Sequence, residues 1–250
     1  MDESPRDDAV RPSGRASLEE STELQSEVLE DLRSAVNYRR WLAGLAEPWL
    51  GDDPLEIGTG LGDYAELWAG PGRSMTVSEA DPGRLAALRE RFARRTDVTV
   101  RELTVPIAVV AGHSAVVALT VVEHIEDDVA GLRTFARLLR PGGRVVLIVP
   151  AFPIAMSRFD REIGHFRRYR VHSMTDALTA AGLRPLQVRY VNSIGLLGWL
   201  VLVRLLRGRP QEGFALTAYD RFVVPVLRRL ETWVPPPFGQ SVFAVAEKSG

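Results

Sequence analysis

The sequence predicts an α/β fold built on one mostly parallel sheet of seven strands, with helices on both faces and a helical insertion near the C-terminus. From residue 54 to 192, short apolar runs alternate with stretches of helical periodicity, as expected of successive strand–helix units. The chain has 250 residues, of which 46% are hydrophobic and 25% charged, so it is long and apolar enough to bury a sizeable core.

The expected elements follow from periodicity and from turn residues. Strands are expected near residues 54–57, 74–79, 97–102, 114–120, 143–149, 184–191 and 240–248, and helices near 62–69, 82–95, 127–140 and 173–181. Pro141-Gly142-Gly143 is expected to end the third of these helices, while Ser173 caps the fourth and Gly182 stops it. Residues 151–170 contain prolines, aromatics and clustered arginines, and we expect a loop that shapes a substrate site.

Composition divides the chain into one α/β core with additions. We expect a disordered tail at 1–16, an amphipathic helical region at 17–50, the core at 51–192, a helical insertion or cap at 193–240, and the final strand with its tail at 241–250. The apolar stretch from Ile194 to Leu206 is too short to span a bilayer. An ordinary buried helix is the leading interpretation, and the alternatives are a cover over an apolar pocket, a subunit contact or peripheral contact with a membrane through Arg204, Arg207 and Arg209.

The net charge and the lack of cysteine argue against nucleic-acid partners and exclude disulfides and thiolate metal sites. The net charge of −1 argues against nucleic acid, whose binding requires several phosphates to be neutralised. There is no cysteine, hence no disulfide or thiolate metal site, and we expect no metal ligand set. The first residues lack the features of a secretory leader, so we expect a cytoplasmic protein, monomeric or homodimeric, and the near-exclusive use of arginine over lysine suggests a bacterium with a GC-rich genome.

A glycine-rich turn follows the first expected strand, at Gly58-Thr59-Gly60-Leu61-Gly62. In open parallel sheets this turn is the usual anchor for a ligand, and glycines let the ligand approach the backbone closely. A dinucleotide fingerprint requires a sixth-position glycine, where this chain has Asp63. The alternative is a tight turn with only a structural role.

Acidic residues end the second and third expected strands. Glu79 stands 21 positions after Gly58, where a carboxylate can accept both hydroxyls of a ribose. Asp81 is its rival, but Pro82 suits the first turn of a helix and so places Asp81 near the helix cap. Glu102 ends the third strand, where it or the next backbone amide could meet an adenine edge.

Four segments, LEIGTGLGDY, VSEADP, ALTVVEHIEDD and LLRPGGRVVLIVP, follow one another within residues 53–190. In this order they resemble the class I S-adenosylmethionine-dependent methyltransferases, in particular the branch similar to ubiquinone-biosynthesis O-methyltransferases and to type 11 and 12 methyltransferases. The resemblance implies a Rossmann-like fold, S-adenosyl-L-methionine as donor and S-adenosyl-L-homocysteine as product. It implies cofactor contacts from Glu56, Gly58, Thr59, Gly60, Gly62, Glu79, Ala80, Glu102, Leu103 and Thr120. The family often has Asn at the position of Thr120 and Asp at that of Ser114.

Two histidines are candidates for the base that takes the proton of an acceptor hydroxyl. His124 follows the fourth strand, and His165 lies in the loop at 151–170. The alternative for His124 is a structural role, paired with a nearby acid such as Glu123. The alternative for the loop is a solvated basic segment in which His165 only fixes the conformation. The candidates for binding the acceptor are Glu123, Arg167, Arg168 and Tyr169. The guanidinium groups of the two arginines suit anionic or sugar-like ligands.

The leading functional hypothesis is methyl transfer to a small-molecule or lipid-linked acceptor, at oxygen. Nitrogen and carbon acceptors, as in natural products, are the first alternative. A nicotinamide oxidoreductase is a second hypothesis, disfavoured by Asp63 and by the lack of a Tyr-x-x-x-Lys pair, since Lys248 is the only lysine. A non-catalytic binding protein that keeps the fold is the third.

Overall fold

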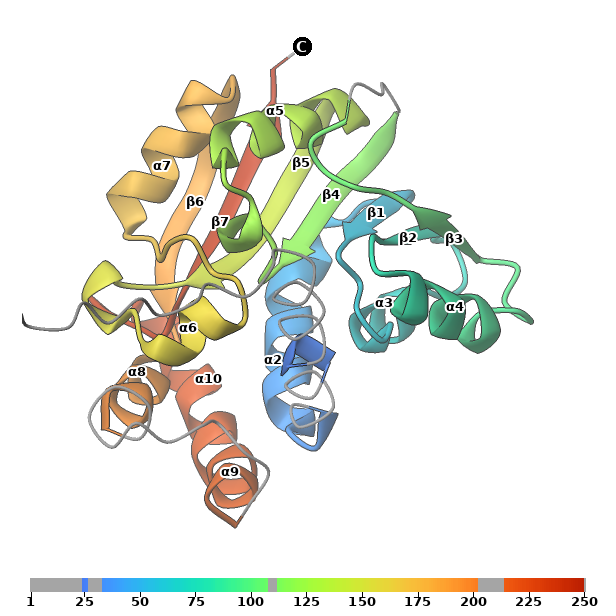
Figure 1. Ribbon diagram of the computed structural model, residues 1–250. Coiled ribbons are helices and arrows are strands. Elements are labelled where there is room, and N and C mark those ends of the chain that lie inside the picture. The colour runs from blue at the N-terminus through green and yellow to red at the C-terminus, as the bar shows by residue number, and fades with distance from the viewer. Residues whose placement is uncertain (1–23, 27–32, 108–111, 202–213, 250) are drawn as a thin grey trace, which may run out of the picture.

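The computed structural model describes residues 24–26, 33–107, 112–201 and 214–249. Within these residues lie the strands β1 (Pro54–Ile57), β2 (Met75–Glu79), β3 (Val98–Glu102), β4 (His113–Leu119), β5 (Leu139–Pro150), β6 (Leu183–Val191) and β7 (Ser241–Lys248). They form one sheet in the order β3-β2-β1-β4-β5-β7-β6 (Figure 1). The pairs from β3 to β5 are parallel, and β7 is antiparallel to both β5 and β6. The predicted fold class, a mostly parallel seven-stranded sheet, is confirmed.

Helices cover both faces of this sheet. Those of the α/β core are α2 (Val36–Ala46), α3 (Asp63–Trp68), α4 (Pro82–Arg91), α5 (Asp128–Leu138), α6 (Arg158–Glu162) and α7 (Val171–Ala180), with short 3₁₀ turns η1 (Glu47–Trp49), η2 (Val122–His124) and η3 (Pro153–Ala155). Between β6 and β7 come α8 (Ser193–Trp199), α9 (Phe214–Ala218), the π-helical turn η5 (Tyr219–Val223) and α10 (Val224–Trp233). In Figure 1 these insertion helices gather at the lower end of the sheet.

Two apolar cores lie on opposite faces of the sheet because successive strand residues point to opposite sides. In β5, Val145 and Leu147 belong to the core formed with α5 and α7, whereas Val146 and Ile148 belong to the core formed with α2, α3, α4 and α10. All four are almost completely buried. The central strands therefore have no solvent-facing side, and polar chemistry is concentrated at their ends.

Several predicted boundaries were wrong by a few residues. The helix expected at 127–140 ends at Leu138, and Pro141-Gly142-Gly143 lies inside β5, because β5 already pairs with β4 at Leu139. Ser173 is not the cap of α7, which begins at Val171. Its hydroxyl accepts a hydrogen bond from the Arg170 backbone N–H at 2.9 Å, from within the first turn. The loop at 151–170 contains η3 and the short helix α6.

The predicted division of the chain stays a prediction. The tail at 1–16 and the arginines at 204, 207 and 209 lie outside the described residues. Across the parts that the structure describes, no helix combines the length and the apolar character needed to cross a membrane.

The insertion is joined to the N-terminal helix through one carboxylate. Asp220, in η5, is 6% exposed and accepts hydrogen bonds from the backbone N–H groups of Asn37 and Tyr38, at 3.1 and 2.8 Å. These are unpaired donors of the first turn of α2, whose own cap position, Ala35, provides no side-chain acceptor. A residue distant in sequence thus caps α2 and fixes it against α10.

We predict that Asp220→Ala lowers the free energy of unfolding by about 1–3 kcal/mol, because it leaves two half-buried N–H groups without this acceptor. Chemical denaturation followed by circular dichroism measures the change. Arg221→Ala, at an exposed neighbour, is the matched control. Equal stability of the two variants would contradict the capping role of Asp220.

Candidate functional site

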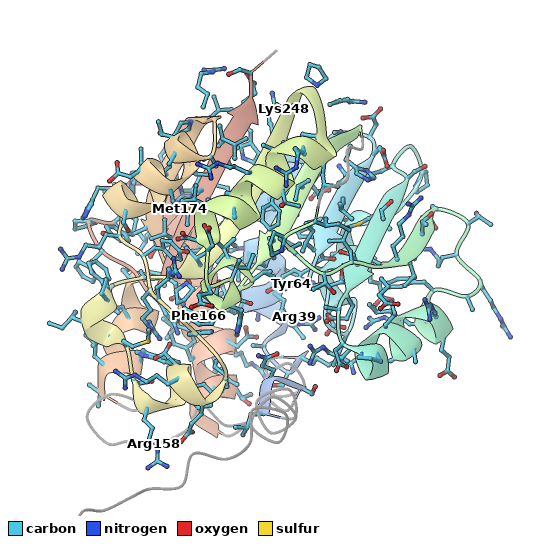
Figure 2. The ribbon with its side chains drawn as sticks, turned by 45° about the horizontal axis from the view of Figure 1, so that its top comes forward. Arg39, Tyr64, Arg158, Phe166, Met174 and Lys248 are labelled. Carbon is cyan, nitrogen blue, oxygen red and sulfur yellow. The ribbon has the colours of Figure 1, made fainter. Side chains whose placement is uncertain are left out.

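The candidate site lies where the strand order reverses. β1 has β2 on one side and β4 on the other, and all three are parallel, so their carboxyl ends meet at one edge of the sheet. In Figure 2, Tyr64 from α3 and Arg39 from α2 are labelled near this edge, and Phe166 marks the loop after α6. The edge therefore has a side formed by α2 and α3 and a side formed by the loop at 151–170.

The glycine turn has the backbone conformation that its sequence requires. Gly58, Gly60 and Gly62 have positive φ angles of 66°, 61° and 86°. A Cβ at Gly58 would stand 2.7 Å from Val121 Cγ2, so both the conformation and the space select glycine there. The turn is closed by backbone bonds from Thr59 to Ser78 at 2.9 Å and from Gly62 to Thr59 at 3.1 Å.

Glu79 joins the end of β2 directly to this turn. Its Oε2 accepts the Gly60 N–H at 3.0 Å, and its Oε1 accepts the N–H groups of Ala80 and Asp81 at 3.0 and 3.1 Å. The guanidinium of Arg84 lies 3.3 Å from Oε1. Glu79 is 5% exposed, and a carboxylate oxygen that accepts a single N–H keeps acceptor capacity for a ligand hydroxyl.

Asp81, unlike Glu79, caps a helix, as its position directly before Pro82 predicts. Its side chain caps α4 by accepting the Arg84 N–H at 2.8 Å. This geometry supports the choice of Glu79 over Asp81 as the ribose ligand, which stays a prediction.

Glu56 is a buried carboxylate that lacks a full set of partners. It points from β1 toward the α2 side of the sheet, is 2% exposed, and its Oε2 has no hydrogen-bond partner among the described residues. The pKa of Glu56 is raised to about 8, mainly by burial and in addition by the carboxylates of Asp63 and Glu79, against a hydrogen bond from Thr59 that lowers it. An uncompensated buried acid beside a glycine turn fits a ligand with a cationic group, such as the amino group of the methionine portion of S-adenosylmethionine.

The remaining predicted cofactor residues surround this edge. Glu102 ends β3 and is exposed, and the Leu103 N–H donates to the Glu79 carbonyl at 3.4 Å. Thr120, directly after β4, is exposed and has a positive φ of 56°, which a non-glycine residue rarely adopts. The structure thus brings the predicted residues to one edge, and their individual contacts with a cofactor stay predictions.

The N-terminal segment also reaches this edge, which the sequence pattern did not reveal. Arg84 donates to the Ser26 hydroxyl at 3.2 Å, and the Gln25 side-chain amide donates to the Ile163 carbonyl at 2.7 Å. Leu24 packs against Phe159 and Ile163. Residues 24–26 therefore connect α4 with the loop at 151–170 across the strand ends.

The side of the edge formed by the loop at 151–170 contains a compact group of ionisable side chains at the end of β4. Ligand atoms of Glu123, His124 and His165 lie within 4.8 Å of one another, and the two imidazole rings meet edge to face at 4.6 Å between centroids. Burial raises the pKa of Glu123 to about 7, against the opposing charge of His165. Burial lowers the pKa of His124 to about 4, and the charge of His165 contributes in the same direction.

Asp160 organises this side, and the sequence analysis missed it. Its Oδ1 is 3.0 Å from His165 Nδ1 and 2.7 Å from an Arg168 guanidinium nitrogen, and its Oδ2 binds the backbone N–H and hydroxyl of Ser157. Burial alone would raise the pKa of Asp160, but the bond to His165 and the charge of Arg168 hold it well below its usual value. Ser157 and Asp160 form a capping box, whose S-x-x-D pattern was a readable signal.

Three of the four residues expected to bind the acceptor, Arg167, Arg168 and Tyr169, are engaged within the protein. Arg168 is 5% exposed, binds Asp160, and stacks on Trp199 with its guanidinium carbon 4.5 Å from a ring centroid. The Tyr169 hydroxyl donates to Asp128 at 2.8 Å, and Arg167 forms an ion pair with Asp128 at 2.9 Å. These contacts favour a structural role, anchoring the loop at 151–170 to the start of α5, over the expected binding of an anionic acceptor.

Comparison with known proteins identifies the domain that contains this edge. Residues 55–145 match the family model described as a methyltransferase domain. A protein of Mycolicibacterium smegmatis, named a probable S-adenosylmethionine-dependent methyltransferase, is 31% identical over 155 residues, which cover 60% of this chain and 57% of that protein. The matched region thus spans little more than half of that relative.

Solved structures agree on the fold. A chain from the complex between the Haloferax volcanii Trm112 methyltransferase activator and its methyltransferase superposes with a TM-score of 0.63 at 14% identity, covering 99% of this chain and 100% of that one. A sarcosine dimethylglycine methyltransferase structure from Galdieria sulphuraria gives 0.58 at 14% identity, with 86% of each chain covered. At these identities the likeness concerns the fold alone.

We predict that Glu56→Gln stabilises the cofactor-free chain at alkaline pH. The pKa of Glu56 is raised on folding, so the stability that the protonated acid contributes is complete below pH 4.5 and is lost as the pH rises through 8. The variant should exceed the wild type by more than about 1 kcal/mol at pH 8, with a smaller difference near pH 5. Denaturant titrations at both pH values measure this.

The exposed Glu90→Gln on α4 is the matched control and should show no such pH-dependent gain. A difference between Glu56→Gln and wild type that stays constant with pH would show that the acid is not held protonated.

Proposed function

Because residues 55–145 match a methyltransferase-domain model and a relative is named a probable S-adenosylmethionine-dependent methyltransferase, we propose that the chain is a class I methyltransferase of this kind. It would transfer the methyl group of the cofactor to an oxygen atom of a small-molecule or lipid-linked acceptor. The observation that carries the proposal is the donor side of the strand edge. There Glu56, buried and with Oε2 lacking a partner among the described residues, and the strand-end Glu79 flank a glycine turn in the left-handed conformation.

Each of the predicted cofactor residues would contact a different part of S-adenosylmethionine. Glu56 would pair with the amino group of the methionine portion, the Gly58–Gly62 turn would lie against that portion, and Glu79 would accept the ribose hydroxyls. Glu102 and Leu103 would meet the adenine. When bound, S-adenosylmethionine supplies an electrophilic methyl group on a sulfonium, so the remaining task of the protein is to hold the acceptor in line and to accommodate its proton.

The acceptor would lie between the cofactor and the Glu123–His124–His165 cluster. Since His165 Nδ1 is bound to Asp160, the other ring nitrogen, Nε2, faces Glu123 at 3.8 Å and is the ring atom available on the acceptor side. A histidine oriented by a carboxylate in this way suits proton abstraction from a hydroxyl. The cluster would therefore activate the acceptor oxygen. Either His165 acts as the base, or an ion held by the cluster lowers the pKa of the hydroxyl.

An apolar surface beside the site supports a lipid-linked acceptor. Exposed apolar side chains line α8 and the region of α10, namely Ile194, Leu197, Val201, Phe222, Val226, Leu230 and Trp233. In α10, positions 226, 230 and 233 fall on one helical face. Trp199, also in α8, donates its ring N–H to the Ala155 carbonyl at 3.1 Å and so connects this surface to the loop at 151–170. Peripheral contact with a membrane would place this surface against the lipid.

We predict that Glu79→Ala weakens the binding of S-adenosyl-L-homocysteine at least about tenfold, because the ribose hydroxyls and the Gly60 N–H both lose their acceptor. Isothermal titration calorimetry measures the affinity. Asp81→Ala, which removes only the cap of α4, is the matched control and should cost less. Absence of binding by folded wild-type protein would refute the proposed function, and NADH binding in its place would favour the oxidoreductase.

We predict that His165→Gln and His124→Gln each lower turnover by about 100-fold or more while the affinity for S-adenosyl-L-homocysteine stays within about threefold of wild type. His172→Gln, at an exposed position of α7, controls for the loss of a histidine. Turnover on candidate hydroxyl, amine and carbon acceptors is followed by release of S-adenosyl-L-homocysteine. Wild-type turnover in both variants would remove these histidines from the reaction.

A further inference from the structure

The Glu123–His124–His165 cluster has the composition of a metal site. It combines two imidazoles and one carboxylate, and one ligand atom from each lies within 4.8 Å of the others. The residues come from two segments, since Glu123 and His124 lie in η2 and His165 follows α6. The Phe166 N–H donates to the Glu123 carbonyl at 2.8 Å, so the backbone holds the two segments together.

The state of Glu123 points to a missing partner. It is fully buried, with no exposed surface, and neither carboxylate oxygen has a hydrogen-bond partner among the described residues. The nearest cationic candidate is His165 Nε2, at 3.8 Å from Oε1, which is beyond hydrogen-bond distance. A buried carboxylate with both oxygens unsatisfied is costly unless a charged partner binds it.

The surroundings of His165 are those of a metal ligand. Metal-bound histidines usually donate their second ring N–H to a carboxylate, which fixes the tautomer and the ring orientation. Asp160 binds His165 Nδ1 at 3.0 Å and is itself held by Arg168 and Ser157. Nε2 is thereby left to face Glu123.

We propose that this chain binds one divalent transition-metal ion through Glu123, His124 and His165. An ion with metal–ligand distances of about 2.0–2.2 Å requires ligand atoms roughly 3–3.5 Å apart, and the present ligand atoms all lie within 4.8 Å of one another. Two nitrogen ligands and one oxygen select ions such as Zn²⁺, Co²⁺ or Fe²⁺ over Mg²⁺ and Ca²⁺, which prefer oxygen. The site thus departs from the expectation that the chain has no metal ligand set.

Three protein ligands leave coordination positions open at the acceptor side. If the proposed methyl transfer is correct, an acceptor hydroxyl could occupy one of them, where the ion lowers the pKa of the hydroxyl and its proton passes to solvent water. This extension rests on the proposed function. Binding of the ion itself does not, and it is tested without acceptor or cofactor.

The test uses the full chain without a histidine tag, stripped with a chelator and titrated with Co²⁺. We expect one equivalent to bind, with visible absorption bands of a nitrogen- and oxygen-ligated ion, and Zn²⁺ to displace it, whereas millimolar Mg²⁺ does not. Glu123→Gln and His165→Gln should each weaken Co²⁺ binding by at least about tenfold. His113→Gln and His172→Gln, at histidines outside the cluster, should bind Co²⁺ as the wild type does.

Circular dichroism and thermal unfolding establish that each variant is folded. If a cluster variant does not fold, the paramagnetic shifts that Co²⁺ causes in the histidine ring signals of the wild type decide the matter, and they should fall on His124 and His165. No Co²⁺ binding by the folded wild type, or binding that the cluster variants leave unchanged, would overturn the proposal. Binding of S-adenosyl-L-homocysteine with no Co²⁺ binding would overturn this inference alone.

Discussion

Burial of both faces of the central strands is the constraint on which the rest of the structure depends. The side chains of β4 and β5 alternate between two apolar cores, so neither face admits a ligand. Polar groups are confined to the strand ends, and the reversal of strand order between β1 and β4 opens a site at only one of those ends. Three further elements meet there and complete the site, namely α2, residues 24–26 and the loop at 151–170.

Four buried carboxylates at this end differ in how their charge is compensated. Glu79 is satisfied by three backbone N–H groups and Arg84, and Asp160 by Ser157, His165 and Arg168. These two shape the backbone around them. Glu56 and Glu123 have unsatisfied oxygens and raised pKa values, so they reduce the stability of the cofactor-free chain at alkaline pH. A cationic group at either position would offset that cost.

The glycine turn, Glu79 and the order of strands and helices were predictable from the sequence because they depend on local rules. The positive φ angle requires glycine at Gly58, short continuous apolar runs mark strands buried on both faces, and Pro82 places Asp81 at a helix cap. The ends of helices and strands were less predictable where the pairing of strands overrides the preferences of turn residues. Pro141-Gly142-Gly143 has the composition of a helix stop, yet it lies inside β5, in the irregular stretch between the pairs that Leu139 and Arg144 form with β4.

The sequence by itself determined the fold class and the glycine turn at the end of β1, because short-range patterns encode them. Only the tertiary structure decided which charges compensate one another. The sequence predicts Arg168 as a ligand for an anionic acceptor, and the fold of the loop pairs its guanidinium with Asp160. His124 and His165 stand 41 positions apart, and their meeting with Glu123 follows from how the loop at 151–170 packs against the end of β4. Such long-range pairings depend on packing, which no local pattern records.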